Sequence, residues 1–182
     1  ILKGRTTSNY HSLFIVNSKS NIKKIEDLRA KSLTLSDEFS ASGYEVPKYE
    51  LENIGLPITD KKFYKNIYYV KNHDEAIQRV LQGLTDAAAI SSINFEKWFN
   101  SNQKENKSLR VIYKSSAISG PPLVFARNLD PFFKDEIKSI VLDAHNHIDL
   151  GGYGGQMERY IDIKTSQTKH LESYIRPQWG WK

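Results

Sequence analysis

The chain has 182 residues, of which 39% are hydrophobic and 26% are charged, which is typical of one ordinary globular domain or of two small lobes. Its 26 basic and 21 acidic residues give a formal charge of +5. That charge favours anionic partners, but the lysines are scattered among acidic residues, so nucleic acid is not expected as a partner. The absence of cysteine excludes a disulfide framework and thiolate chemistry.

No apolar run approaches the roughly 18–20 residues that a transmembrane helix requires. The first residues, ILKGRTTSNYHS, also lack the charged and then apolar segments of a signal peptide. The sequence is therefore expected to be a fragment or a processed product.

Apolar, β-branched runs alternate along the chain with segments whose apolar residues recur at helical spacing. This alternation predicts a layered α/β fold with a largely parallel sheet. In chain order the predicted elements are strand 12–16, helix 25–30, strand 33–35, helix 46–55, strand 67–70, helix 72–83, strand 85–92, helix 94–100, strands 109–113 and 122–127, and helix 131–148.

The last predicted helix carries one apolar side. Its members are Phe133, Ile137, Ile140, Val141, Ala144 and Ile148. The following GGYGG stretch has no strand before it and indicates a helix terminator rather than a phosphate loop. The polar tail ends in PQWGW, for which the sequence predicts no structure.

The stretch FSASGYE, directly after the strand at 33–35, has two interpretations. Ser42 and Glu45 have the spacing of a capping box, which would make them helix-capping residues only. Alternatively, Ser40, Ser42 and Gly43 lie where a helix start points free N–H groups into the crevice at the strand ends, which suits an anion. Pro47 argues against Ser42 as the cap, because it would then lie beyond the first helical turn, the only part of a helix that tolerates proline well.

His73 begins the next predicted helix, in KNHDEA. Asn72 and Glu75 can cap this helix without it, so the imidazole is either an ordinary surface group or a donor to an anion at a second helix start.

Other polar residues give no catalytic pattern. His145 and His147 are two residues apart, so they would face different sides of a helix, and no metal-ligand set surrounds them. No Ser-His-Asp order and no HExxH motif is present. We therefore expect no enzyme activity, no metal site and no cofactor.

Three stretches, in order from Tyr10 to about Asp130, resemble one family. They are NYHSLFIVNSKSNIKKIEDLRAKSLTLSDEFSASGYEVP, NHDEAIQRVLQGLTDAAAISS and RVIYKSSAISGPPLVFARNLD. They are similar to the Tyr-x-Ser strand, the Ser-Thr-Ser-Gly-Tyr-x-x-Pro helix start, the His-containing helix and the return crossover of the phosphonate/phosphate-binding periplasmic proteins of ABC transporters.

The resemblance implies an α/β fold of the type II periplasmic-binding-protein kind. This is a two-lobed, hinge-closing sandwich, here with a largely complete second lobe and an incomplete first lobe. The implied parts are residues 1–18 as crossover strand and first-lobe remnant, 19–112 as second lobe, 113–150 as return crossover and C-terminal first-lobe elements, and 151–182 as tail.

The resemblance also implies a ligand site. Tyr10 would donate its hydroxyl, the hydroxyls of Ser40 and Ser42 and the N–H groups around Ala41 and Gly43 would hold the phosphoryl oxygens, and His73 would close the other side. Ser91 and Ser92 are further candidates. The sequence departs from the family at Ala41, which lacks the usual hydroxyl, and at Ala30, where the family has glycine. No carboxylate aligns with those that read an aminoalkyl group.

The implied function is that of a solute-binding component of an ABC importer, which captures a phosphonate, phosphate or phosphite between two lobes and presents it to a permease. The implied location is periplasmic or extracytoplasmic and membrane-associated. Two alternatives remain: the extracytoplasmic sensing domain of a signalling protein, and an enzyme built on the same fold.

Overall fold

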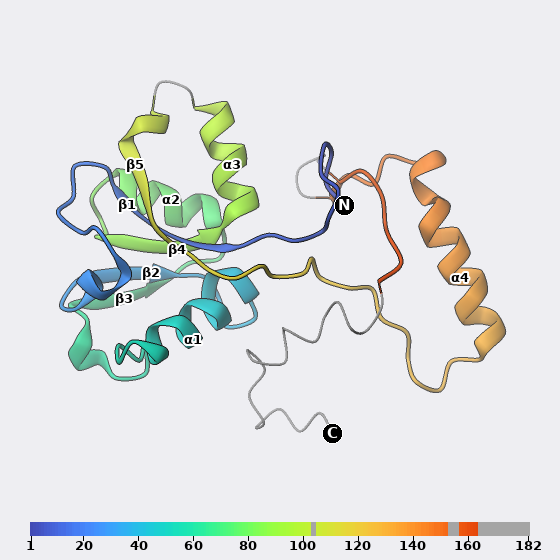
Figure 1. The fold of residues 1–182 in the computed structure, drawn as a ribbon, viewed down its shortest axis with the longest axis horizontal. Helices are drawn as coiled ribbons and strands as arrows, with labels where there is room; N and C mark the ends of the chain where they lie inside the picture. Colours follow the sequence, from blue (N-terminus) through green and yellow to red (C-terminus); the bar gives the residue numbers. More distant parts are fainter. Residues whose placement is uncertain (103–104, 153–156, 164–182) are drawn as a thin grey trace. The chain divides into compact units, whose positions relative to one another are not determined.

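The computed structural model describes residues 1–102, 105–152 and 157–163. The chain divides into two compact units (Figure 1). One contains residues Tyr10–Ile118, and the other contains Ile1–Asn9 together with the chain from Ser119 onward.

The Tyr10–Ile118 unit is built on a five-stranded sheet with the order β3-β2-β4-β1-β5. β2 pairs parallel with β3 and β4, whereas β1 pairs antiparallel with β4 and β5. The predicted α/β class is confirmed, but the sheet is mixed rather than largely parallel because β1 runs against its neighbours. The strands are β1 Ser12–Asn17, β2 Ser32–Leu35, β3 Asn66–Tyr69, β4 Ala87–Ser91 and β5 Leu109–Lys114.

Helices cover both faces of this sheet. α2 and α3 lie on one face and α1 on the other (Figure 1). Short helical turns connect these elements, and the turn η2 precedes α1 directly. The helices are η1 Ile25–Leu28, η2 Ala41–Glu45, α1 Val46–Asn53, η3 Lys61–Phe63, α2 His73–Leu81, α3 Ser92–Ser101 and η4 Asn106–Ser108.

β1 shows why the sheet has two buried faces. Successive side chains of a strand point to opposite faces. Phe14 and Val16 accordingly join the cluster on the α1 side, and Leu13 and Ile15 join the cluster on the α2 and α3 side. A strand buried on both faces explains the unbroken apolar run in this part of the sequence.

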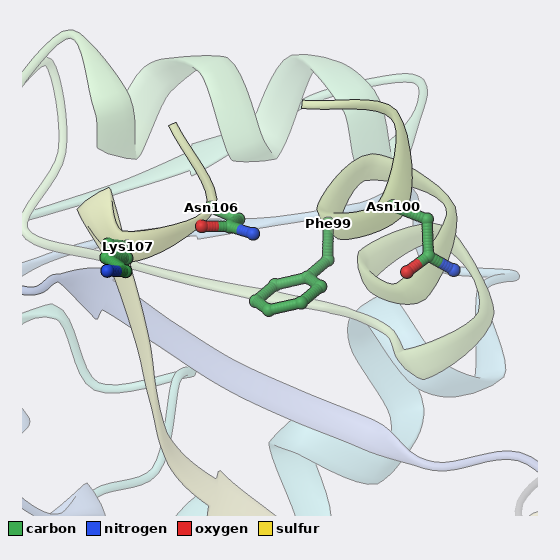
Figure 2. A pocket seen from close by; sticks show the side chains of 4 residues that line it. All are labelled: Phe99, Asn100, Asn106 and Lys107. Atoms are coloured by element: carbon green, nitrogen blue, oxygen red, sulfur yellow. The ribbon is translucent and has the colours of Figure 1, made fainter. Parts of the chain in front are cut away.

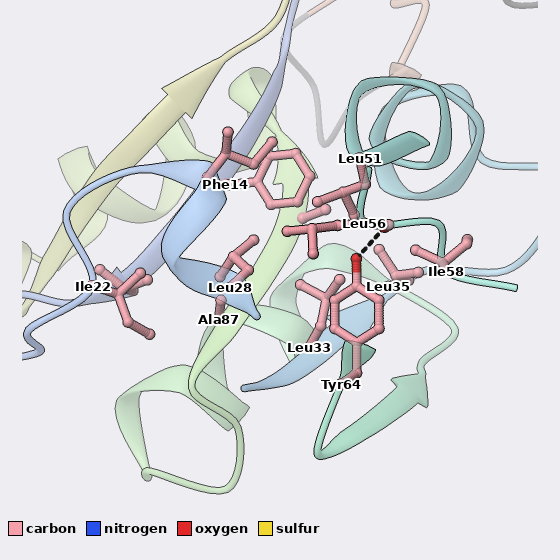
Figure 3. Close-up of a cluster of buried hydrophobic side chains, with 13 residues drawn as sticks. Phe14, Ile22, Leu28, Leu33, Leu35, Leu51, Leu56, Ile58, Tyr64 and Ala87 are labelled. Carbon is pink, nitrogen blue, oxygen red and sulfur yellow. Dashed lines mark hydrogen bonds between the residues drawn. The ribbon is translucent and has the colours of Figure 1, made fainter. Parts of the chain in front are cut away.

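The hydrophobic cluster on the α1 side includes a buried tyrosine, Tyr64 (Figure 3). The Tyr64 hydroxyl donates to the backbone carbonyl of Leu56. Burial raises the pKa of Tyr64, so the hydroxyl keeps its proton and the hydrogen bond. The labelled members of the cluster in Figure 3 are Phe14, Ile22, Leu28, Leu33, Leu35, Leu51, Leu56, Ile58, Tyr64 and Ala87.

On the other face, α2 presents the apolar side that its spacing predicts. Ala76, Ile77 and Val80 are fully buried against the sheet. Gly83, which the sequence marks as the helix end, follows with φ +69°, a conformation that glycine adopts without strain.

The second unit contains α4, Pro131–Asp143, followed by the turn η5, Ala144–Asn146. The predicted helix over 131–148 is therefore confirmed but shorter, and none of the α4 residues is buried. The predicted strand at 122–127 is wrong: these residues are in neither a strand nor a helix. A strand requires a partner for its backbone hydrogen bonds, and no described residue pairs with this segment.

Within the described residues, no helix is both long and apolar enough to span a bilayer. The PQWGW tail and most of GGYGG lie outside the described residues, and so does most of the predicted 151–182 tail.

Candidate functional site

The candidate site lies at one end of the sheet in the Tyr10–Ile118 unit. Because β1 is antiparallel to β4, its first residue, Ser12, pairs with Ser91, the last residue of β4. β2 is parallel to β4, so Ser36, directly after β2, lies at the same end. The first turns of η2, α2 and α3 begin from these strand ends, as in other α/β sheets, where ligands bind at this position.

The η2 turn is capped by Ser40. This residue has extended backbone geometry, and its hydroxyl accepts a hydrogen bond from the backbone N–H of Gly43 at 3.1 Å. The alternative prediction of a capping box from Ser42 to Glu45 is therefore wrong, because helical geometry already begins at Ala41.

This cap changes which amides are left for a ligand. The resemblance assigned amides around Ala41 and Gly43 to the ligand, but the Gly43 N–H donates to Ser40. Ala41 and Ser42 are the first two residues of the turn, so their N–H groups have no acceptor within it. Pro47 falls in the first turn of α1, where a missing N–H costs nothing.

Ser42 is 3% exposed, and its carbonyl and hydroxyl differ in their partners. Its carbonyl accepts from the Ser12 hydroxyl at 2.6 Å. Its own hydroxyl bonds to no residue in the described part of the chain, and the oxygen retains some solvent contact. The Ser42 hydroxyl is therefore held in place through the backbone and remains available as a donor.

His73 is the first residue of α2, and Asn72 is its N-cap, accepting from the backbone N–H of Glu75 at 2.8 Å. The imidazole is consequently surplus to capping, as the sequence predicts. Burial lowers the pKa of His73, while the carboxylates of Asp74 and Asp37 partly oppose the shift. The ring is thus mainly neutral at pH 7.

Ser36 connects this imidazole to the η2 turn. Its hydroxyl lies 3.4 Å from Nδ1 of His73, and its backbone N–H donates to the carbonyl of Gly43 at 2.9 Å. A Cβ on Gly43 would lie only 2.3 Å from the Ser36 Oγ. Glycine is therefore required here for close approach, and Ser36 contacts both the η2 turn and the first residue of α2.

Tyr10 and His11 lie just before β1. Tyr10 exchanges two backbone hydrogen bonds with Ile118 and is partly buried. The Nδ1 atom of His11 lies 2.9 Å from the carbonyl of Ser115; a carbonyl only accepts, so Nδ1 carries the hydrogen.

The two further candidates, Ser91 and Ser92, are buried and act within the protein. The Ser91 hydroxyl caps α3 by accepting from the backbone N–H of Ile93 at 3.2 Å. The Ser92 hydroxyl accepts from the backbone N–H of His11 at 3.1 Å. Each hydroxyl keeps its proton available for donation.

Ser12, Ser36 and Ser115 lie at the candidate site but were not predicted from the sequence as site residues. All three are buried serines at strand ends. The Ser115 hydroxyl accepts from the backbone N–H of Ser12 at 2.9 Å. The one signal in the sequence is the recurrence of serine at the ends of apolar strands, where a hydrophobic residue would otherwise be expected.

A separate pocket of about 420 Å³ lies elsewhere, lined by Phe99, Asn100, Asn106 and Lys107 (Figure 2). Phe99 and Asn100 lie near the end of α3, about 12–14 Å from Ser91 at 1.5 Å per helical residue, and Asn106 and Lys107 belong to η4. The pocket is therefore distinct from the strand-end site. No group of three or more His, Cys, Asp or Glu side chains within the described ranges could hold a metal ion.

Comparison with known proteins defines the family. Residues 2–167 match the family of ABC transporter, phosphonate, periplasmic substrate-binding proteins. The chain therefore belongs to this family of binding proteins, which are not enzymes.

Among individual proteins, the chain is 33% identical to the phosphonates-binding periplasmic protein of Escherichia coli K12 over 70% of its length. It is 27% identical over 92% of its length to a probable ABC transporter phosphite binding protein, PhnD1, of Prochlorococcus marinus MIT 9301. It spans 38% and 60% of the lengths of these two relatives.

Solved structures show the fold. The structure of that PhnD1 in complex with methylphosphonate has a TM-score of 0.70 at 22% identity, covering 92% of this chain and 66% of the PhnD1 chain. XAC2383 from Xanthomonas citri, bound to ATP, has a TM-score of 0.78 at 18% identity, covering 96% of this chain and 66% of that chain. The periplasmic-binding-protein fold predicted from the motifs is confirmed.

Proposed function

We propose that this chain is part of the solute-binding component of an ABC importer and that it binds a phosphonate-, phosphate- or phosphite-like oxyanion at the first turns of η2 and α2. The protein acts in the periplasm or another extracytoplasmic space, close to the membrane, and its macromolecular partner is the transporter permease.

One observation supports this site above all. Among the described residues, the N–H groups of Ala41 and Ser42 and the Ser42 hydroxyl have no hydrogen-bond partner. Ser36 contacts both the η2 turn that carries them and the His73 imidazole, at one end of the sheet. Neutral donors at helix starts suit the oxygens of a tetrahedral anion, because the helix dipole adds partial positive charge without a counter-ion.

The oxyanion binds without chemical change. Each hydrogen bond from a hydroxyl, amide or imidazole to a charged oxygen contributes roughly 1.5–3 kcal/mol net. Tyr10, just before β1, and Ser91 and Ser92, at the β4–α3 junction, add hydroxyl donors. The names of the relatives, which specify phosphonates and phosphite, favour a phosphorus oxyanion.

Calorimetric titration of the complete protein with methylphosphonate, phosphite, phosphate and sulfate tests this function. We expect saturable 1:1 binding of at least one phosphorus oxyanion. At a ligand concentration one hundred times the dissociation constant, the bound anion should add about 2.7 kcal/mol to the free energy of unfolding. A complete lack of binding and of thermal stabilisation across the panel would contradict the proposal.

A further inference from the structure

We propose that Ser36 is a positioning residue for this site. Its hydroxyl fixes which nitrogen of His73 carries the proton, so that the neutral imidazole presents an Nε2–H donor. The inference takes its ligand from the proposed function, but the contact between the two side chains can be tested without a ligand.

The Ser36 hydroxyl is buried and has one hydrogen-bond partner among the described residues, the His73 imidazole. The residue is 2% exposed. Its Oγ lies 3.4 Å from the Nδ1 of His73, and the Gly43 backbone lies so close that a Cβ there would collide with it. Among the described residues, no other hydrogen-bond partner of this hydroxyl is found. The Ser36 hydroxyl is thus held between the η2 turn and the imidazole.

The neutral imidazole has two tautomers with opposite consequences for an anion. With the proton on Nδ1, the ring donates to Ser36, and the lone pair on Nε2 would repel an oxyanion. With the proton on Nε2, the Ser36 hydroxyl donates to Nδ1, and the ring can donate to the anion. A serine hydroxyl can play either role, and its donation to Nδ1 stabilises the tautomer that binds.

The Nε2 atom is free to take this role. No residue within the described ranges bonds to Nε2, and the atom retains some solvent contact. The charged groups that act on the ring are Asp74, next to it on α2, and Asp37, from the segment after β2. Their carboxylates favour the imidazolium, but burial outweighs them, so the tautomer of the neutral ring decides whether a donor faces the ligand.

The experiment is to read the His73 tautomer from imidazole ¹⁵N chemical shifts in the complete protein, with and without saturating methylphosphonate. Wild type and Ser36→Ala are compared at matched pH, so that titration of the phosphonate itself cancels. Ser32→Ala is the control: Ser32 is a buried serine at the opposite end of β2, where its hydroxyl donates to Asp86 Oδ2 at 2.6 Å. It does not contact His73.

We expect the Nε2–H tautomer in the wild type and a shift toward the Nδ1–H tautomer in Ser36→Ala. The affinity for methylphosphonate should fall about tenfold in Ser36→Ala, the loss of roughly one hydrogen bond, and should be unchanged in Ser32→Ala.

Three results would overturn the inference. The first is an Nδ1–H tautomer in the wild type, which can be observed without any variant. The second is the same tautomer in wild type and Ser36→Ala, and the third is an equal loss of methylphosphonate affinity in Ser36→Ala and Ser32→Ala. If the wild type binds none of the oxyanions, the proposed function fails, whereas the tautomer of the free protein still tests Ser36.

Discussion

The hydroxyl of Ser12 donates to the backbone carbonyl of Ser42 across 2.6 Å, and this contact joins the first strand to the turn that begins the candidate site. Ser12 is fully buried, and its own backbone N–H donates to the Ser115 hydroxyl. The position of the η2 turn therefore depends on β1 and on the segment after β5, both of which are distant in sequence.

Replacing Ser12 with alanine should affect both stability and binding. The change leaves the buried Ser42 carbonyl without its donor, which costs about 1–3 kcal/mol in the free energy of unfolding. We expect phosphonate affinity to fall as well, because the turn loses its anchor. Urea denaturation and calorimetry on the same preparations measure the two effects. Unchanged stability would show that this hydrogen bond is not formed in solution.

Ser42→Ala should separate binding from folding. The Ser42 hydroxyl contacts no described residue as a hydrogen-bond partner, so its loss should leave the free energy of unfolding nearly unchanged. Affinity for methylphosphonate should fall by about 1–3 kcal/mol. Ser40→Ala is the contrast: it removes the helix N-cap and should cost about 1 kcal/mol of stability in addition to any loss of affinity. Equal affinity in Ser42→Ala and wild type, measured by calorimetry, would remove Ser42 from the site.

Gly43→Ala should disrupt the site by crowding. The added Cβ would lie 2.3 Å from the Ser36 Oγ and 2.9 Å from the Ser40 Oγ, so the turn or Ser36 must move. We expect loss of phosphonate binding and lower thermal stability. Gly55→Ala serves as a matched control, since Gly55 has φ +73° but open space around it. It should cost about 1 kcal/mol of stability and leave affinity intact. Normal binding by Gly43→Ala would contradict the close approach.

The depressed pKa of His73 predicts how stability depends on pH. Because the folded-state pKa lies below the unfolded value, the unfolded chain takes up a proton more readily. The contribution of His73 to stability is therefore present above about pH 6.5 and is lost as the pH falls toward the folded-state pKa. Urea denaturation at about pH 7.5 and 5.5 should show a smaller loss on acidification for His73→Gln than for the wild type. Equal losses would place the ring in an unperturbed environment.

Most of the fold could be predicted from the sequence because the burial of a strand or helix determines the pattern of its apolar residues. The unbroken apolar run of β1 and the apolar side of α2 each indicate an element whose position the structure confirms. The run at 122–127 shows the limit of this reasoning. Apolar, β-branched residues favour a strand, but a strand also requires a neighbour, and Val124 is 81% exposed with none among the described residues.

The candidate site was predictable in part for a different reason. Ser40, Ser42 and His73 follow strands, and the ends of parallel strands meet at one edge of a sheet. The roles of Ser12 and Ser36 could not be predicted, because the partner of a hydroxyl is set by tertiary contacts rather than by spacing. The same applies to the choice of Ser40 as the cap: three nearby residues, Ser40, Ser42 and Gly43, are all acceptable at that position.

The paired hydrogen bonds between Tyr10 and Ile118, at 2.9 and 2.7 Å, place the two ends of the Tyr10–Ile118 unit beside each other. All five strands of the sheet lie between these two residues, so a fragment of residues 10–118 would contain the whole sheet. We expect a recombinant fragment of residues 10–118 to fold autonomously, with the antiparallel bridge between Tyr10 and Ile118 holding its two termini together. Such a fragment would be a small, isotope-labelled target for NMR.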